Sequence, residues 1–303
     1  MWFAEDVAQG SAPGRIGKVD MSAQSVTEYQ IPDPTFGCCI SHVSPGAVTL
    51  GPDGKIWFNS IVGSRSISGR KHPDTVALTN YFGSVTTDGQ TFSLYGYNPS
   101  VFGAFVSVAA GSDGNLWFTY QGGAGGVGGV AKVTTIGTIV QNIAANYVPG
   151  SIIAGPDNNL WFTEDGARIG RVTTSGALSE FSTGLSGYSI SNGNITTDGT
   201  HIIFTATNQN TLRAYLGTMT TTGSLMALQT VPYSGRQASM PVVADLHNYH
   251  VLDTGMTQVP IYGGGQTTFT LPDPNSQRSG MVESPCCGIW YTDKSTNSIV
   301  QFY

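Results

Sequence analysis

The sequence predicts an all-β protein, a β-propeller of four-stranded antiparallel blades in which seven blades are favoured, six are possible, and the terminal blades are incomplete. The first observation is an internal repeat, since nearly the same segment occurs at 51–58 (GPDGKIWF), 111–118 (GSDGNLWF) and 155–162 (GPDNNLWF). Each copy of such a repeat is one supersecondary unit that buries its apolar face on its neighbours. The second observation is the distance between successive copies of the repeat. The shorter of these distances are about forty residues, which suits a propeller blade and is too long for a leucine-rich repeat. The third is composition, because 40 glycines and 15 prolines supply many turns while only 11% of residues are charged.

The clearest repeat, residues 150–183, shows how one blade is built. Short segments rich in β-branched and aromatic residues, separated by turn residues, are typical of strands joined as hairpins. The Asp and Asn residues of the first turn tolerate turn dihedrals. From the inner to the outer edge, the predicted strands are 151–156, 160–165, 168–174 and 177–183.

The same order of strands recurs along the chain, with the repeat's aromatic position at Trp2, Trp57, Trp117, Trp161, Ile203, Trp290 and, less clearly, Val251. The N-terminus supplies a second, third and outer strand, and the C-terminus supplies a first, second and third. Joining them into one blade gives six blades but leaves two surplus strands, whereas counting both gives seven. A missing strand leaves unpaired backbone groups that invite pairing with another segment. We therefore expect a single domain, 1–303, with blades at 1–32, 46–98, 105–145, 150–183, 192–232, 238–274 and 279–303.

Charge and hydropathy exclude two classes of partner. The net charge is −6, whereas nucleic-acid binding normally shows a basic patch, so we expect no nucleic-acid partner. No apolar run approaches the roughly 18 residues of a membrane helix, so we expect no membrane span. Met1 leads straight into a predicted strand, and the chain shows no secretory signal at this point.

The repeat motif resembles that of a known family. GPDG-x-(L/I)-WFTE, followed by RIGRVTT-x-G and a strand ending in EF, is similar to the virginiamycin B lyase (streptogramin lyase) family, most clearly at 150–183. The resemblance implies a seven-bladed propeller. In the enzyme it implies a magnesium-dependent elimination that opens a cyclic depsipeptide antibiotic at its ester linkage without consuming water. It further implies a metal and a general base that depend on His and Glu near the central axis.

This chain lacks the histidine of that pattern. Five residues before each repeat's turn, where the family places it, stand residues that cannot act as a base or nitrogen ligand: Gly46, Val106, Gly150, Asn192, Met240 and Ser279. Without a histidine the elimination has no obvious base. We therefore predict no catalytic residue and no cofactor, with magnesium only if the chain is a lyase.

Acids do remain at the end of the second strand in three blades, as Glu5, Glu164 and Asp293. Because Mg²⁺ accepts oxygen ligands, these three are weak candidates for a metal site. Asn59, Tyr120 and Ala206 are assigned to the matching position in other blades.

Two other motifs have simple interpretations. His247 and His250 form an H-x-x-H pair, which could bind zinc on a helix. Here a turn leads into a strand, which would point the two side chains to opposite faces, so we expect ordinary polar residues. The glycine-rich run 122–129 predicts a wide loop, with a flexible binding lip as the alternative.

Four cysteines occur as two adjacent pairs, Cys38–Cys39 and Cys286–Cys287. An even count in two places is compatible with disulfides in an oxidising setting, and sequence alone cannot choose among three pairings. Placed on opposite faces, the pairs would suit head-to-tail bonding between stacked copies. The simpler alternative is buried free thiols that behave as small apolar residues.

A candidate partner surface lies on one predicted face, where the loops 32–45, 61–77 and 121–129 gather. The second loop carries the basic residues Arg65, Arg70, Lys71 and His72 in an otherwise acidic chain. We expect this face to contact a protein partner, another subunit or a glycan. The nearby Tyr95, Tyr97 and Phe102 would suit a sugar or protein contact, although most aromatic residues of this kind are expected simply to pack between blades.

These observations together favour a non-catalytic structural or binding propeller. Its low charge and its Gly, Ser and Thr content suggest an extracellular protein or a virion component. The expected partner is a protein or further copies of the chain, bound at the loop face or at open blade edges. Two alternatives stay open: a Mg-dependent lyase that opens cyclic depsipeptide antibiotics, and a carbohydrate-binding module.

Overall fold

The structure is a computed structural model that describes residues 1–5, 14–22, 24–32, 40–64, 80–123, 126–190, 195–235, 240–273, 278–284, 288–293 and 296–302. At residues 40–45, 60–64 and 279 it describes the backbone alone. The chain divides into two compact units, Met1–Val148 and Pro149–Tyr303, and each is treated by itself below. Among the described residues, no helix is both long and apolar enough to cross a membrane.

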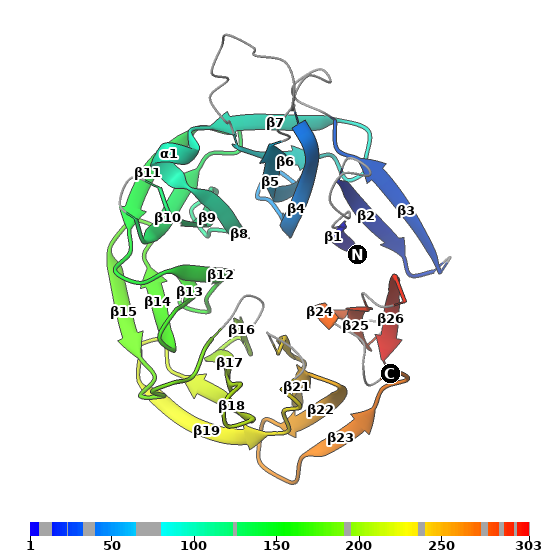
Figure 1. Cartoon of the computed structure of the whole chain (residues 1–303), viewed down its shortest axis with the longest axis vertical. Coiled ribbons are helices and arrows are strands. Elements are labelled where there is room, and N and C mark those ends of the chain that lie inside the picture. Colours follow the sequence, from blue (N-terminus) through cyan, green and yellow to red (C-terminus); the bar gives the residue numbers. More distant parts are fainter. Residues whose placement is uncertain are drawn as a thin grey trace, which may run out of the picture. The chain divides into compact units, whose positions relative to one another are not determined.

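The first unit contains three antiparallel sheets whose strands are sequential neighbours (Figure 1). Their orders are β1-β2-β3, β4-β5-β6-β7 and β8-β9-β10-β11. One short helix, α1 (Pro99–Phe102), lies between the last two sheets, with the Asn98 side chain accepting a hydrogen bond from Ser100 N at its start. The strands are β1 Trp2–Glu5, β2 Arg15–Asp20, β3 Ser25–Gln30, β4 Ile40–Leu50, β5 Ile56–Ser64, β6 Asn80–Val85, β7 Phe92–Tyr97, β8 Ala104–Ala110, β9 Leu116–Gln121, β10 Gly128–Val133 and β11 Ile139–Ala144.

The second unit contains four sheets of the same kind, in the orders β12-β13-β14-β15, β16-β17-β18-β19, β20-β21-β22-β23 and β24-β25-β26. The strands are β12 Pro149–Ala154, β13 Leu160–Glu164, β14 Arg168–Val172, β15 Leu178–Ser182, β16 Ile195–Thr197, β17 Ile202–Asn208, β18 Arg213–Met219, β19 Leu225–Val231, β20 Val242–Ala244, β21 Asn248–Leu252, β22 Gly255–Pro260, β23 Thr267–Thr270, β24 Arg278–Ser284, β25 Gly288–Asp293 and β26 Ser298–Phe302.

These sheets confirm the all-β prediction and the strand order expected in every repeat. The described residues form seven sheets, of which five have four strands and the first and last have three. The first sheet holds the predicted second, third and outer strands, and the last holds the predicted first, second and third. The favoured count of seven with incomplete terminal blades is therefore confirmed.

One expectation was wrong in the second sheet. Residues 40–45 and 61–64 were predicted to lie in loops, but β4 begins at Ile40 and β5 continues to Ser64. Their backbones pair from Ile40–Ser64 to Leu50–Ile56, with register shifts after Ile40 and Pro45. Proline is tolerated at such irregularities because a ladder hydrogen bond is already interrupted there.

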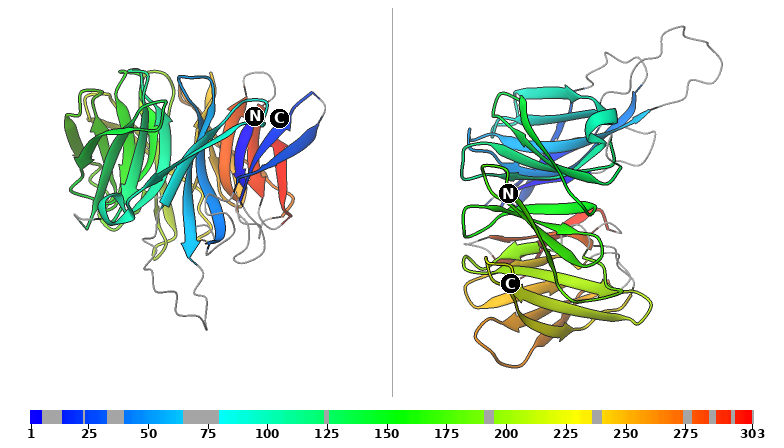
Figure 2. Two further views of the ribbon diagram at one scale, coloured as in Figure 1. Left: turned by 90° about the horizontal axis from the view of Figure 1, so that it is seen from above. Right: turned by 90° about the vertical axis from the view of Figure 1, so that its left-hand side faces the viewer.

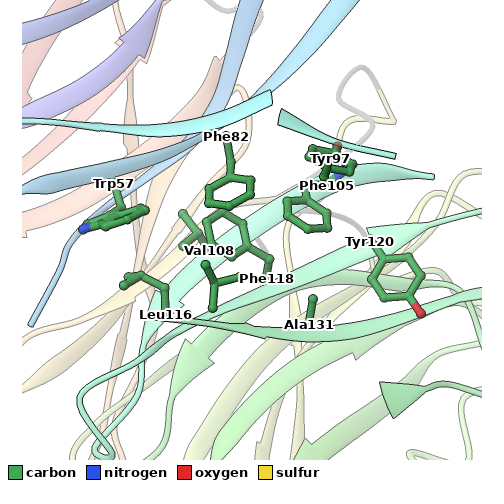
Figure 3. Close-up of a cluster of buried hydrophobic side chains, with 10 residues drawn as sticks. Trp57, Phe82, Tyr97, Phe105, Val108, Leu116, Phe118, Tyr120 and Ala131 are labelled. Atoms are coloured by element: carbon green, nitrogen blue, oxygen red, sulfur yellow. Dashed lines mark hydrogen bonds between the residues drawn. The ribbon is translucent and has the colours of Figure 1, made fainter. Parts of the chain in front are cut away.

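Neighbouring sheets within a unit lie face to face (Figure 2). Apolar side chains pack between them. In the first unit, Trp57 and Phe82 of the second sheet meet Phe105 and Phe118 of the third (Figure 3). The Phe105 and Phe118 rings are stacked 4.9 Å apart, and burial of large aromatic rings dominates the energy of such cores. Within each unit the repeat therefore folds because one sheet covers the face of the next.

Three repeats also fix their own first turn through a tryptophan. The indole Nε1 of the second-strand tryptophan donates a hydrogen bond to the aspartate of the preceding turn at 2.9, 3.2 and 2.9 Å, in the pairs Trp57–Asp53, Trp117–Asp113 and Trp161–Asp157. A buried indole N–H needs such a partner. The G-x-D-x-x-x-W spacing of the sequence repeat is thus a local hydrogen-bonded unit.

A second contact joins three of the sheets to the sheet that follows them in the chain. The glycine of the turn between third and outer strands lies against an aromatic ring of the preceding sheet's outer strand, in the pairs Gly89–Tyr29, Gly137–Tyr95 and Gly223–Phe181. A Cβ atom at any of these glycines would come within about 2 Å of the ring, and all three glycines have positive φ. We call these three pairs the ring–turn contacts.

Candidate functional site

The candidate site is built on the acids that end the second strands. In the fourth sheet, Glu164 is the last residue of β13 and lies opposite Arg168 of β14 and Pro149 of β12. Glu180 of β15 lies on the same face of the sheet, opposite Gly170. The strand alternation therefore gathers two carboxyl groups and one guanidinium group at one end of one sheet face.

Glu164 is buried, with 1% of its surface exposed. Neither of its carboxyl oxygens has a hydrogen-bond donor among the described residues. Burial, reinforced by the neighbouring Glu180 carboxyl group, raises the pKa of Glu164 to about 9, and Arg168 opposes this effect only in part. At neutral pH the Glu164 carboxyl group is therefore protonated and carries no charge.

The first sheet repeats this arrangement in a more open form. Glu5 ends β1 opposite Arg15, and Glu28 lies on the outer strand opposite Gly17. Arg15 Nη1 and Glu28 Oε2 form an exposed ion pair at 2.5 Å. Burial, followed by the Glu28 charge, raises the pKa of Glu5, while Arg15 lowers it.

The seventh sheet pairs its acid with a cation. Asp293 ends β25 directly opposite Arg278 of β24, and Arg278 Nε lies 3.8 Å from Asp293 Oδ2. Arg278 is buried and donates hydrogen bonds to the main-chain carbonyls of Asp253 at 3.2 Å and Asp273 at 2.5 Å. Asp293 is thus the counter-ion of an arginine that joins the sixth and seventh sheets.

A fourth acid, Asp253, was missed by the sequence analysis. It is buried and accepts hydrogen bonds from Ser234 N at 2.6 Å and Ser234 Oγ at 3.0 Å. It was missed because Val251 was taken as the equivalent of the repeat's tryptophan. In the structure the residue equivalent to the tryptophan is His250. Its Nε2 lies 2.6 Å from Oδ2 of the turn residue Asp245, which matches the contact between each tryptophan indole and its turn aspartate.

The H-x-x-H pair is not a metal-binding pair. His247 lies in the turn before β21, and its backbone N–H donates to Asp245. His250 is 2% exposed and its ring is held by the same aspartate. The prediction of a turn that leads into a strand is confirmed, and His250 serves as a replacement for a core tryptophan.

The strand pairing corrects the residue matched to Glu164 in the second sheet. Asn59 was expected there, but Ser60 follows Trp57 by the same three residues as Glu164 follows Trp161. The Asn59 amide donates to the carbonyls of Phe105 at 2.8 Å and Val106 at 3.2 Å. Thr205 of the fifth sheet makes the same kind of bond, to the carbonyl of Met240 at 2.6 Å, two residues before the sixth sheet's inner strand begins.

The described residues do not fit the magnesium site that the resemblance implies. No three His, Cys, Asp or Glu side chains of the described chain gather closely enough to hold a metal ion. Of the three candidate acids, Asp293 already faces the Arg278 cation, and Glu164 is held in its neutral form. A neutral carboxyl group and a guanidinium-paired carboxylate are poor ligands for a divalent cation.

Several predicted site residues lie outside the described part of the chain. These are the cysteines Cys38, Cys39, Cys286 and Cys287, and the basic loop residues Arg65, Arg70, Lys71 and His72. Their predicted roles stay predictions. The glycine-rich run does join two strands, with β9 ending at Gln121 and β10 beginning at Gly128.

The aromatic residues suggested for sugar binding are part of the core. Tyr97 is 5% exposed and stacks on Phe105 at 4.2 Å (Figure 3). Tyr95 stacks on Trp57 at 5.6 Å, and Phe102 packs edge-on against Phe105. Tyr97 is therefore buried in the core, whereas Tyr95 and Phe102 are half-buried against it, and their predicted role in sugar binding stays a prediction.

Comparison with known proteins shows which family the chain belongs to. The sequence model of the virginiamycin B lyase family matches residues 1–182, more than half of the chain. The chain belongs to the virginiamycin B lyase family. No curated protein sequence matches it.

Solved structures of this family are similar over nearly the whole chain. A streptogramin B lyase is 20% identical with a TM-score of 0.70, covering 98% of this chain and 96% of that one. A catalytically inactive histidine-to-alanine variant of virginiamycin B lyase from Staphylococcus aureus, with quinupristin, is 19% identical with a TM-score of 0.68, covering 99% and 97%. A propeller that is not named as a virginiamycin B lyase, the WD40 β-propeller domain of Doa1, is also similar. It is 11% identical with a TM-score of 0.58, covering 98% of this chain and 86% of that one. At these identities the likeness shows the β-propeller fold and nothing finer.

Proposed function

We propose that this member of the virginiamycin B lyase family is a binding or structural propeller that does not carry out the lyase reaction. The observation that carries the proposal is the absence of a base where the family pattern has its histidine. Among the described residues these positions hold Gly46, Val106, Gly150 and Met240, none of which can accept a proton. An elimination needs a group that removes a proton within hydrogen-bond reach of the reacting carbon.

The state of the remaining acids supports the same proposal. The Asp293 carboxylate is opposed by Arg278, and Glu164 is neutral at physiological pH because its pKa is raised to about 9. A neutral carboxylic acid is not a base, and a carboxylate paired with arginine is a weak one. Asp293 faces the arginine that joins the sixth and seventh sheets, and Glu164 keeps its own proton rather than taking one from a substrate.

The proposed partner is a protein or further copies of this chain, and the proposed setting is extracellular or virion-associated. The low charge of the chain and its two cysteine pairs support this setting, because disulfides persist under oxidising conditions. The alternative function is the magnesium-dependent opening of a cyclic depsipeptide, which family membership favours.

One assay separates the two functions. The purified chain is incubated with quinupristin and magnesium chloride, with the S. aureus virginiamycin B lyase as positive control, and ring opening is followed by mass spectrometry. The proposal expects no ring-opened product above the rate without protein. Ring opening that scales with the concentration of this chain would refute it and establish the lyase.

A further inference from the structure

The outer strand of the fifth sheet, β19, presents apolar side chains to solvent. It is the last strand of that sheet and pairs with β18 alone among the described strands (Figure 1). Its first six residues are all exposed, and three of them are large and apolar, with 37% of Leu225, 55% of Met226 and 37% of Leu228 exposed. The strand, LMALQTV, contains no charged residue and no proline, which are the residues that usually protect such an edge.

Two other outer strands carry a carboxylate where β19 has Leu228. This position is set by the register, because Leu228 lies opposite Gly217 of the third strand, which in turn lies opposite Phe204 of the second. The same register gives Glu28 in the first sheet and Glu180 in the fourth. Along the described outer strands the residues at this position are Glu28, Leu94, Asn142, Glu180, Leu228 and Thr268. The leucine of the second sheet is half-buried, so the fifth sheet alone exposes a large apolar side chain there.

The backbone groups of Leu228 point toward the open edge. Along an antiparallel pair, residues that exchange hydrogen bonds with the neighbouring strand alternate with residues that do not. In the fourth sheet Thr183 N donates to Ala167 O at 3.3 Å, and counting back by two residues from this pair leaves Glu180 among those whose N–H and C=O point outward. Leu228 has the same register. Two residues further on, the carbonyl of Thr230 accepts a side-chain hydrogen bond at 2.8 Å from the glutamine that precedes β23, which agrees with an outward direction.

We propose that two copies of this chain pair through β19, antiparallel about a two-fold axis at Leu228, so that their two fifth sheets form one continuous sheet. A residue on such an axis meets its own copy, so Leu228 faces Leu228 and the two exchange both of their outward backbone hydrogen bonds. Met226 of each copy lies opposite Thr230 of the other. The pairing removes the exposed leucine pair from water and adds cross-strand side-chain contacts.

Charge is the reason why a second copy fits this edge. A second β19 supplies an uncharged residue at every paired position. The same two-fold pairing at the first or fourth sheet would set Glu28 against Glu28 or Glu180 against Glu180, and like charges directly opposite are destabilising. Self-pairing is therefore specific to the fifth sheet in comparison with these two. The proposal rests on the proposed binding or structural function and adds where copies of the chain meet.

The test uses the full chain with dithiothreitol present, so that the cysteines cannot link two copies. Sedimentation velocity from about 1 to 100 μM measures the fraction of dimer. Leu228→Glu gives β19 the residue that β3 and β15 already carry at this position, so the monomer should keep its fold while two carboxylates meet on the axis. The proposal expects a dimer of the wild type and a dissociation constant at least about tenfold higher for Leu228→Glu. Leu246→Glu is the matched control, since Leu246 lies in the turn before β21 with 83% of its surface exposed, and it should dimerise like the wild type.

A mixture of two variants tests the position of the axis. Leu228→Lys should dimerise as weakly as Leu228→Glu, because two ammonium groups then meet. An equimolar mixture of the two variants should restore the dimer, because a lysine of one copy then faces a glutamate of the other. In the wild type, the amide proton of Leu228 should exchange more slowly with solvent at 100 μM than at 1 μM.

Three results would overturn the proposal. The first is a wild type that stays monomeric at every concentration, which would leave this edge to a different partner. The second is a dimer that Leu228→Glu weakens no more than Leu246→Glu does, and the third is a mixture of the glutamate and lysine variants that stays monomeric. Ring opening of quinupristin would overturn the proposed function and leave the sedimentation results unchanged, so the two failures are distinguishable.

Discussion

Replacing Glu164 with glutamine should remove a large part of the pH dependence of folding stability. In the unfolded chain this carboxyl group has its ordinary pKa of 4.5, whereas in the folded chain the value rises to about 9. The folded state therefore binds a proton that the unfolded state releases between these two values. Stability that is fully present below pH 4.5 is lost progressively as the pH rises toward 9.

The magnitude follows from the size of the shift. Each pKa unit corresponds to about 1.36 kcal/mol, so at pH 7, about 2.5 units above the unfolded value, the loss is about 3 kcal/mol. Glutamine has nearly the same shape and never ionises. Glu164→Gln should therefore match the wild type near pH 4 and exceed its free energy of unfolding by about 3 kcal/mol at pH 7.

Urea denaturation followed by tryptophan fluorescence at pH 4, 5.5, 7 and 8 measures the difference. Glu180→Gln serves as a matched variant on the neighbouring strand, because removing that charge should lower the Glu164 pKa and give a shallower slope than the wild type. The reasoning fails if wild type and Glu164→Gln lose stability in parallel across this range. It also fails if Glu164→Gln is the less stable protein at pH 8.

Two further predictions concern contacts between sheets. Arg278→Met should lower the free energy of unfolding by about 3–5 kcal/mol, because it leaves the buried Asp293 carboxylate without its cation. Adding Asp293→Asn should restore part of this loss. If the effects of the two substitutions on the free energy of unfolding simply add, the prediction is contradicted. Gly223→Ala should cost about 2–4 kcal/mol, since its φ is +86° and the new Cβ would lie 2.1 Å from the Phe181 ring, whereas Gly199→Ala, with φ +84° and open space, should cost only about 1 kcal/mol. Urea midpoints test both, and equal losses at the two glycines would show that the ring contact does not matter.

The repeated parts of the fold could be predicted from the sequence because local and tertiary signals agree there. The turn aspartate and the tryptophan four residues on occur in one short segment, and together they report a contact within the same blade. The sequence could not predict in this way that β4 and β5 extend into the segments 40–45 and 61–64, which were expected to be loops. Residues 40–45 and 61–64 contain Ser, Gly and Pro beside β-branched residues, and pairing across a distant segment decides their structure.

The candidate site was only partly predictable, since its chemistry depends on partners far along the chain. Glu164 and Asp293 occupy equivalent positions, yet one is a neutral acid beside Glu180 and the other is a carboxylate beside Arg278. No local pattern distinguishes them. Asp253 escaped notice because a histidine replaces the tryptophan in its blade, and only the hydrogen bond from His250 to Asp245 reveals the correct alignment.

The ring–turn contacts give the chain a direction. In each of the three pairs the ring belongs to the earlier sheet and the glycine to the later one, and the second sheet carries both halves, with Gly89 facing the first sheet and Tyr95 facing the third. A cut at one of these three junctions therefore breaks one such contact, and a duplicated second sheet brings both matching halves. Gain or loss of that sheet still leaves an aromatic ring facing a turn glycine at the new junction, which makes the repeat the natural unit by which a chain of this kind grows or shortens.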